Sequence, residues 1–274
     1  MIDSHVHFWN YHPVKDAWIN EEMKVIQRDF KPLDMETNLL ENGITGCVAV
    51  QADQTEHETN FLLAYAEKYP FIKGIVGWID LRADNLPERL SSFANQPNLK
   101  GWRHVAQSEP AGFLTSEEFF RGIAELQQYQ YTYDILIYQS QLDDAITLVE
   151  KFPEQKFVLD HLGKPNIETK KDIDKWRDGI KVLSQNKNLC AKVSGLVTEA
   201  DWKNWKYDDL IFYLDTVFEY FGPQRLMFGS DWPVCTVVAQ YRMIKEMMEK
   251  YTSQLTAYDQ KSFFETTAVN FYNL

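Results

Sequence analysis

The chain has 274 residues, of which 45% are hydrophobic and 25% charged, a composition typical of a globular protein with a substantial core. Its formal net charge of −12 argues against partners rich in phosphate, so we expect neither nucleic acid nor an anionic membrane surface to bind it. Three cysteines without CxxC spacing give no support to a disulfide framework or a cysteine-based zinc site. With neither a transmembrane-length apolar run nor a signal-peptide pattern, we expect a cytoplasmic protein.

Short β-rich runs alternate with longer amphipathic segments along the whole chain. Strands are expected at residues 2–8, 46–52, 72–80, 99–106, 132–138, 156–162, 189–195 and 225–231. The segments between them have helical periodicity, and a last helix is expected at 259–273. That last helix either closes the bottom of the fold or mediates a homodimer.

Three helix boundaries follow from local signals. Gly43 is expected to end its helix in the left-handed conformation. Thr55 and Glu58 have the spacing of a capping box ahead of an apolar run. Thr115 and Glu118 repeat that spacing, which predicts a second capped helix.

Eight strands that alternate with helices predict parallel strands joined by crossover helices, and eight such units close a (β/α)8 TIM barrel. We therefore expect an α/β protein in which one domain spans 1–274. A doubly wound open sheet is the competing arrangement, but no GxGxxG motif follows the first strand. The segment 9–32 is long for a connection in a barrel, so we expect a functional loop over its C-terminal mouth.

The first strand contains two histidines, His5 and His7, separated by Val6. Because residues i and i+2 of a strand point the same way, the two imidazoles share a face and can reach one ion or one substrate. A pair of hydrogen-bonded buried histidines is the alternative explanation.

Other ionisable or polar residues lie at the ends of later strands. Burying so many of them without partners would be costly, and catalytic residues of a TIM barrel lie at the C-terminal ends of its strands. They are Arg103, His104, Tyr138, Asp160, His161, Lys192, Ser194 and Asp231. These positions predict an active site at that end of the barrel.

Four stretches, IDSHVHFW, KGWRHVAQSEP, VLDHLGKP and FGSDWPVC, occur in this order over almost the whole chain. Together they resemble the amidohydrolase superfamily, in the sugar-lactonase-like branch (amidohydrolase family 2) of L-fuconolactonase, L-rhamnonolactonase and 2-pyrone-4,6-dicarboxylate lactonase. The resemblance implies a (β/α)8 barrel and a hydrolase that opens the ring of a small lactone. A sugar aldonolactone of the L-fucono or L-rhamnono type is the expected substrate.

The resemblance also implies a set of metal ligands. In the wider superfamily the first-strand histidines and the aspartate that ends the eighth strand bind metal, which here points to His5, His7 and Asp231, with His161 as a further candidate. Histidine and aspartate are ordinary zinc ligands, and three of them leave a position open for water. Lactonases of this branch resemble one another in needing little or no metal, so one Zn²⁺ and metal independence both stay open.

Two departures from the superfamily pattern argue against two metal ions. The fourth strand has Arg103 and His104 where a bridging lysine would lie. The fifth strand ends at Tyr138, with no histidine. A full binuclear centre is therefore not expected.

Asp231 is expected to be the general base that deprotonates the attacking water, which the histidines would orient. The oxyanion of the tetrahedral intermediate needs a positive or hydrogen-bonding partner. The candidates for that partner are Arg103, His104 and His161.

Four residues are expected to contact the substrate. The flat indoles of Trp9 and Trp232 suit the C–H faces of a sugar ring, and packing is the alternative explanation for both. Tyr138 and Lys192 are expected to contact substrate hydroxyls, with a structural hydrogen bond or ion pair as the alternative. The few basic residues near the expected site favour a neutral sugar lactone over a pyrone dicarboxylate.

Two other functions remain open at this point. One is a decarboxylase of an aromatic or unsaturated acid in the same superfamily, which would share the histidine pair and the last aspartate. The other is a non-catalytic sugar-binding barrel, and the presence of both Asp231 and the histidine pair argues against it. Cys235 follows the candidate base closely, but we interpret it as a buried apolar residue rather than a nucleophile.

Overall fold

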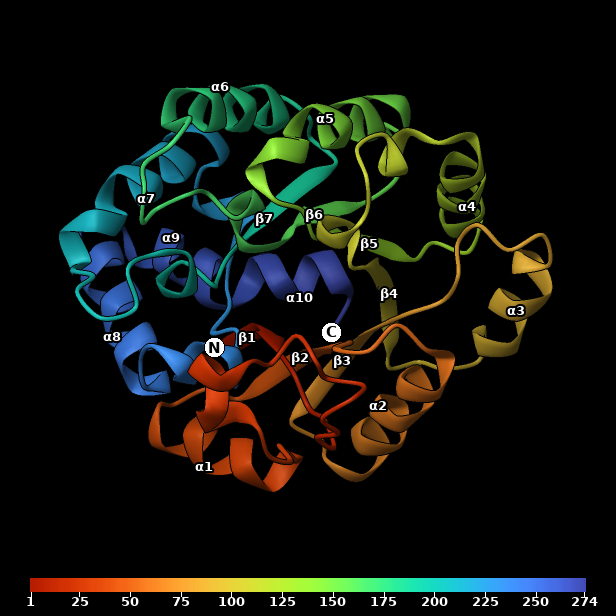
Figure 1. Cartoon of the computed structure of the whole chain (residues 1–274), viewed down its shortest axis with the longest axis horizontal. Coiled ribbons are helices and arrows are strands. Elements are labelled where there is room, and N and C mark those ends of the chain that lie inside the picture. Colours follow the sequence, from red (N-terminus) through yellow and green to blue (C-terminus); the bar gives the residue numbers. More distant parts are fainter.

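The computed structural model describes all residues from 1 to 274. Eight parallel strands lie side by side in chain order, from β1 to β8. They are β1 (Ile2–Val6), β2 (Gly46–Val50), β3 (Ile72–Gly77), β4 (Leu99–His104), β5 (Thr132–Ile135), β6 (Phe157–Leu159), β7 (Leu189–Val193) and β8 (Leu226–Phe228). Figure 1 shows these strands as a ring with helices outside it, so the predicted single-domain (β/α)8 barrel is confirmed.

Helices α1 to α7 connect the strands on the outside of the ring, and α8 to α10 follow the last strand. They are α1 (Pro32–Glu41), α2 (Glu56–Lys68), α3 (Leu86–Phe93), α4 (Glu117–Gln128), α5 (Leu142–Lys151), α6 (Ile173–Ser184), α7 (Tyr207–Phe221), α8 (Tyr241–Thr252), α9 (Ala257–Lys261) and α10 (Thr267–Tyr272). None of them is long and apolar enough to cross a membrane.

The local signals placed two helix boundaries correctly and one a residue early. Gly43 has a φ of +66°, as its predicted stop requires. Thr55 caps α2, because its hydroxyl accepts a hydrogen bond from the Glu58 amide at 3.2 Å. The cap of α4 is Ser116 and not Thr115, since the Ser116 hydroxyl accepts from the Phe119 amide at 3.3 Å.

Every expected strand is present, but each one ends before the run that predicted it. The shortest strands are β6 and β8, with three residues each, where the chain leaves the sheet directly after the last paired residue. His161 and Asp231 follow these two strands with φ values of +52° and +60°, so both lie in left-handed turns. The apolar pattern continues past the strand because the turns that carry these side chains are buried as well.

The last helix closes the N-terminal end of the barrel. In Figure 1 α10 lies across the ring of strands. Its apolar residues pack against side chains that point into the barrel from five strands. The residues in this contact are Ala268, Phe271 and Tyr272 from α10, and Ile2, Val48, Val50, Val76, Val158 and Met227 from the strands. Of the two roles open for the expected helix 259–273, the structure shows the closing of the barrel.

The long segment after β1 is attached to the opposite, C-terminal end. Trp9 and Phe30 exchange backbone hydrogen bonds of 3.0 and 2.9 Å, which fold the segment back on itself. The Phe30 ring then packs edge-on against Trp232, which follows β8, with 5.3 Å between ring centroids. This places the base of the loop beside the residues that end β1 and β8.

Candidate active site

Two ends of the chain meet where the barrel closes. The Asp231 amide donates to the His5 carbonyl at 3.0 Å, and the His7 amide donates to the Trp232 carbonyl at 2.7 Å. These backbone bonds bring the side chains together: Asp231 Oδ1 lies 3.4 Å from His7 Nε2 and 3.8 Å from His5 Nε2. The two histidine Nε2 atoms are 3.1 Å apart.

His161 approaches the same point from the turn after β6. Its ring centroid lies 4.5 Å from that of His5. The turn needs a close neighbour without a side chain, since a Cβ added to Gly195 would lie 2.7 Å from His161 Nδ1. Gly195 also has a φ of +66°, a conformation that favours glycine. The sequence SG after β7 therefore leaves the space that the His161 ring occupies.

The Nδ1 atoms of His7 and His161 face hydrogen-bond partners and leave Nε2 free. His7 Nδ1 lies 2.8 Å from the carbonyl of Val50, which can only accept, so His7 carries its proton on Nδ1. His161 Nδ1 lies 2.8 Å from the hydroxyl of Ser194, which can accept from a proton on Nδ1 and so allows the same tautomer. Both Nε2 atoms then present lone pairs, the usual arrangement of a histidine that binds metal.

Four ionised side chains lie directly beneath these histidines, and we call them the buried charge cluster. They are Arg103, Asp134, Asp160 and Lys192, which are between 0% and 4% exposed. Arg103 Nη1 lies 3.1 Å from Asp160 Oδ2 and 3.3 Å from His5 Nε2. Lys192 Nζ lies 2.5 Å from Asp134 Oδ2 and 3.1 Å from Asp160 Oδ1. Two positive and two negative charges therefore balance inside the barrel.

Burial and charge fix the protonation states of the site at neutral pH. Burial lowers the pKa of His5 well below its usual value and that of His161 to about 4, so both rings are neutral. Burial alone would raise the pKa of Asp231, but the neighbouring His161, together with His7 and His5, holds it below its usual value. Asp231 is thus an ionised carboxylate among neutral imidazoles.

This donor set fits one divalent ion. One atom each from His5, His161 and Asp231 lies within 4.8 Å of the others, and all three residues are buried. The Nε2 atoms of His5 and His7 lie 3.1 Å apart and face the same position, so both are within reach of one ion there. Neutral imidazoles and a carboxylate are the ligands that Zn²⁺ takes in catalytic sites.

His104 does not join this group. It follows Arg103 on β4, so its side chain points to the other side of the strand. Trp78 Nε1 donates to His104 Nδ1 at 3.2 Å, and His104 Nε2 lies 2.8 Å from Glu109 Oε1. This placement argues against the expected contact between His104 and the reacting oxyanion, because both ring nitrogens already have other partners.

Three of the four residues expected to contact substrate are placed in the interior. Trp9 is 1% exposed, and its Nε1 donates to the Arg28 carbonyl at 2.8 Å. Trp232 is 3% exposed, and Lys192 belongs to the buried charge cluster. Packing and ion pairing, the alternatives to substrate contact, describe these three residues in the structure.

Tyr138 is the one residue of that set at the surface, with 45% of its area exposed. It follows β5 and lies beside Lys164, whose Nζ is 5.5 Å from the tyrosine ring centroid. Both residues line a cavity of about 310 Å³ together with Gln139 and Trp176. Tyr138 therefore stays a candidate for substrate contact at the C-terminal end.

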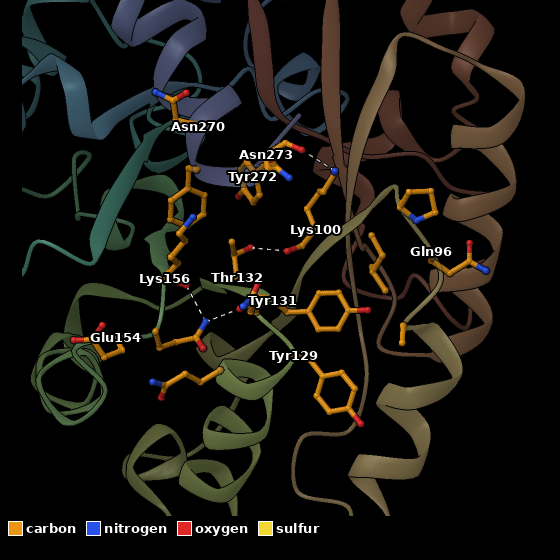
Figure 2. Close-up of a pocket in the computed structure, with 17 residues that line it drawn as sticks. Gln96, Lys100, Tyr129, Tyr131, Thr132, Glu154, Lys156, Asn270, Tyr272 and Asn273 are labelled. Carbon is orange, nitrogen blue, oxygen red and sulfur yellow. Dashed lines mark hydrogen bonds between the residues drawn. The ribbon is translucent and has the colours of Figure 1, made fainter.

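A larger cavity, of about 600 Å³, lies at the other end of the barrel. Figure 2 shows it between the first residues of β4 and β5 and the end of α10, where Lys100, Thr132 and Tyr272 line it. Cavity size thus does not indicate where the His5 and Asp231 side chains lie.

Two acids shape the site, of which the sequence placed Asp160 among the strand-end residues without a specific role and did not single out Asp134. Asp160 contacts both His5 and Arg103, and Asp134 lies within the apolar stretch TYDILIY of β5. Asp134 could have been recognised as part of the site, because a single carboxylate in a strand buried on both faces requires a buried partner of opposite charge.

Comparison with known proteins agrees with this geometry. The family model described as amidohydrolase matches residues 2–274. The chain is 38% identical over 284 residues to L-fucono-1,5-lactonase of Burkholderia multivorans, covering 100% of this chain and 96% of that protein. It is 30% identical to L-fucono-1,5-lactonase of Burkholderia ambifaria, covering 88% and 82%.

Solved structures show the same relationship. The crystal structure of an amidohydrolase from Burkholderia multivorans with bound zinc has a TM-score of 0.95 and 38% identity, covering 100% of this chain and 99% of that one. A probable 2-pyrone-4,6-dicarboxylic acid hydrolase from Acinetobacter baumannii has a TM-score of 0.78 over 100% and 99% of the two chains, and at 16% identity it shows the fold alone. On its sequence and its site, the chain belongs to the amidohydrolase family.

Proposed function

We propose that this protein hydrolyses a small sugar lactone, of the L-fucono-1,5-lactone type, with Asp231 as the general base. The observation that carries the proposal is the ionised Asp231 carboxylate, which lies at the C-terminal end of the barrel beside the neutral rings of His5 and His161 and the Nε2 atom of His7. The full-length similarity to proteins named L-fucono-1,5-lactonase supports the choice of substrate class.

We infer that one divalent ion, Zn²⁺, is held by His5, His161 and Asp231, with His7 facing the same position. When bound, such an ion polarises a carbonyl group and lowers the pKa of water. The bound zinc in the Burkholderia multivorans structure supports this assignment.

Asp231 takes the proton of the attacking water. Its lowered pKa keeps the carboxylate ionised at neutral pH, so its oxygens are free of a proton when the water binds. His7 Nε2 lies 3.4 Å from the carboxylate, and the Val50 carbonyl fixes the His7 ring in that orientation. The water oxygen then forms a bond to the lactone carbonyl carbon, whose π electrons move onto the oxygen.

The resulting oxyanion needs a donor, and Arg103 is our first candidate. Its Nη1 lies 3.3 Å from His5 Nε2 and so reaches the edge of the site, while Asp160 and Gln51 hold the guanidinium. His161 is the second candidate. When the intermediate collapses, the ring C–O bond breaks and the proton held by Asp231 passes to the leaving alkoxide, which gives a hydroxy acid.

The experiment that tests this function is a pH-indicator assay with L-fucono-, L-rhamnono-, L-galactono- and D-arabinonolactone. Acid release above the spontaneous rate on one or two members, lost in D231N, is the expected result. No release on any member, together with CO₂ release from an aromatic acid, would replace the lactonase by a decarboxylase.

A further inference from the structure

The side chains beneath His5 extend the site to the far end of the barrel. Tyr272, in the C-terminal helix α10, is 2% exposed, and its hydroxyl lies 3.0 and 2.9 Å from the two carboxylate oxygens of Asp134. Asp134 Oδ2 lies 2.5 Å from Lys192 Nζ, and Lys192 Nζ lies 3.3 Å from His5 Nδ1. A continuous chain of polar contacts therefore joins the last helix to the first-strand histidine.

His5 Nδ1 faces two competing partners. Lys192 can only donate, so a hydrogen bond from its Nζ would make Nδ1 an acceptor and move the imidazole proton to Nε2. Asp160 Oδ1, at 3.4 Å, can only accept, so a bond to it would keep the proton on Nδ1. The second arrangement alone leaves the Nε2 lone pair facing His7 and Asp231.

Two observations favour the second arrangement. Lys192 Nζ lies closer to Asp134 Oδ2, at 2.5 Å, than to His5 Nδ1, at 3.3 Å. Asp160 Oδ1 is buried without a hydrogen-bond donor of its own, although Lys192 lies 3.1 Å away as an ion pair. A proton on His5 Nδ1, 3.4 Å away, would give this oxygen its donor.

We propose that Tyr272 and Asp134 are positioning residues that draw the Lys192 ammonium toward Asp134, so that His5 keeps its proton on Nδ1 and presents Nε2 to the site. The proposal deepens the proposed function and rests on it for the role of His5. Tyr272 orients both oxygens of Asp134, and Asp134 in turn gives Lys192 a partner other than the imidazole. The C-terminal helix would thus set the tautomer of a first-strand residue.

Charge supports the same conclusion. The buried charge cluster is neutral as a whole, with Arg103 and Lys192 opposite Asp134 and Asp160. Without the negative charge of Asp134, an excess positive charge would lie beneath His5, and Lys192 would turn to Asp160 and His5. Both changes weaken the binding of a cation at Nε2.

The test compares Y272F with the matched control Y131F. Tyr131 is also buried, lines the same cavity in Figure 2 and donates its hydroxyl to the Phe93 carbonyl at 3.1 Å, away from Asp134. Zinc affinity is measured by chelator competition, and the His5 tautomer by ¹⁵N NMR of the metal-free protein with H5Q for assignment. Melting temperatures of all variants show whether they fold.

We expect about a tenfold weaker zinc affinity and a population of Nε2-protonated His5 in Y272F, and no change in either in Y131F. D134N should give a larger loss, up to about a hundredfold. The double variant D134N/K192M should restore the Nδ1-protonated tautomer, because the competing donor is gone. A merely structural role would not restore it.

Wild-type zinc affinity and tautomer in both Y272F and D134N would overturn the proposal. If the wild-type chain binds no zinc, the tautomer in the metal-free protein decides the question alone. Loss of affinity in Y272F with no lactone turnover in the wild type would overturn the proposed function and leave this proposal standing.

Discussion

His7 and Asp231 stand at opposite ends of the sequence, and their side chains lie 3.4 Å apart because backbone hydrogen bonds join β1 to the residues after β8. The same bonds close the barrel. Formation of the site and closure of the fold are therefore one event, which explains why a chain that opens on DSHVH carries its partner aspartate near its other end.

Removing the base should abolish hydrolysis with little effect on folding. D231N keeps the size of the side chain but cannot accept a proton, so kcat/KM should fall by about 10² to 10⁴. The matched control is E109Q, because Glu109 contacts His104 and not the site. Steady-state kinetics and melting temperatures of both variants check this, and wild-type turnover in D231N would refute the mechanism.

Replacing single histidines should separate ligands from bystanders. H5Q and H161Q each remove one of three donor atoms, so bound zinc, counted by atomic emission, should fall well below one per chain. H104Q should keep its zinc, since both His104 nitrogens bind other side chains. Equal zinc loss in all three variants would speak against the assigned ligands.

Arg103 should contribute to kcat more than to KM. R103K keeps a positive charge for Asp160 but cannot reproduce the fork of guanidinium contacts to Asp160 and Gln51. If Arg103 stabilises the oxyanion, kcat should fall about 10²-fold with KM within a few-fold of wild type. A change confined to KM would assign the arginine to substrate binding instead.

Trp9 should matter for stability and not for substrate. Its ring is buried against Trp18 and Phe30, with centroids at 6.0 and 5.4 Å. W9F should therefore lower the free energy of unfolding by about 1 to 2 kcal/mol and leave KM unchanged. A raised KM at wild-type stability would restore the substrate contact expected from the sequence.

Glu58 should make the protein less stable as pH rises. Burial raises the pKa of Glu58 to about 7, although its carboxylate accepts hydrogen bonds from the amides of Ala52 and Asp53. The unfolded chain releases this proton near pH 4.3, so the folded state binds more protons from there to pH 7. The free energy of unfolding should fall by roughly 3 kcal/mol over that window from this residue.

The check is denaturant unfolding of wild type and E58Q at pH 5 and pH 8. Glutamine does not titrate, so the contribution of Glu58 to the pH dependence should vanish in the variant. The same slope in both proteins would mean that the backbone hydrogen bonds, and not burial, control the Glu58 carboxyl.

The barrel and the convergence of His5, His7, His161 and Asp231 followed from the sequence, because strand order fixes which end of each strand carries the site. His104 could have been separated from Arg103 by the same reasoning, since adjacent residues of a strand point to opposite sides. The alternation of side chains along a strand does not show, however, how far along the barrel axis each side chain lies.

Lys192 illustrates this last point. It lies on the inner face, as expected, but beneath His5, where it is buried in contact with Asp134 and Asp160. The partners at that depth come from β5 and β6, whose stagger is set by the closed sheet. Because that stagger cannot be read from the sequence, the sequence predicts on which face of the sheet a side chain lies but not which residues contact it.

The most direct test of the proposed metal-assisted lactonase is a zinc titration. The protein is stripped with a chelator and zinc is returned in steps, while the initial rate of L-fucono-1,5-lactone opening and the zinc bound per chain are measured on the same samples. The mechanism predicts a rate that rises in proportion to bound zinc and levels off at one per chain. Full activity in the stripped protein would contradict the role of the metal, and no activity at any zinc content would contradict the lactonase itself.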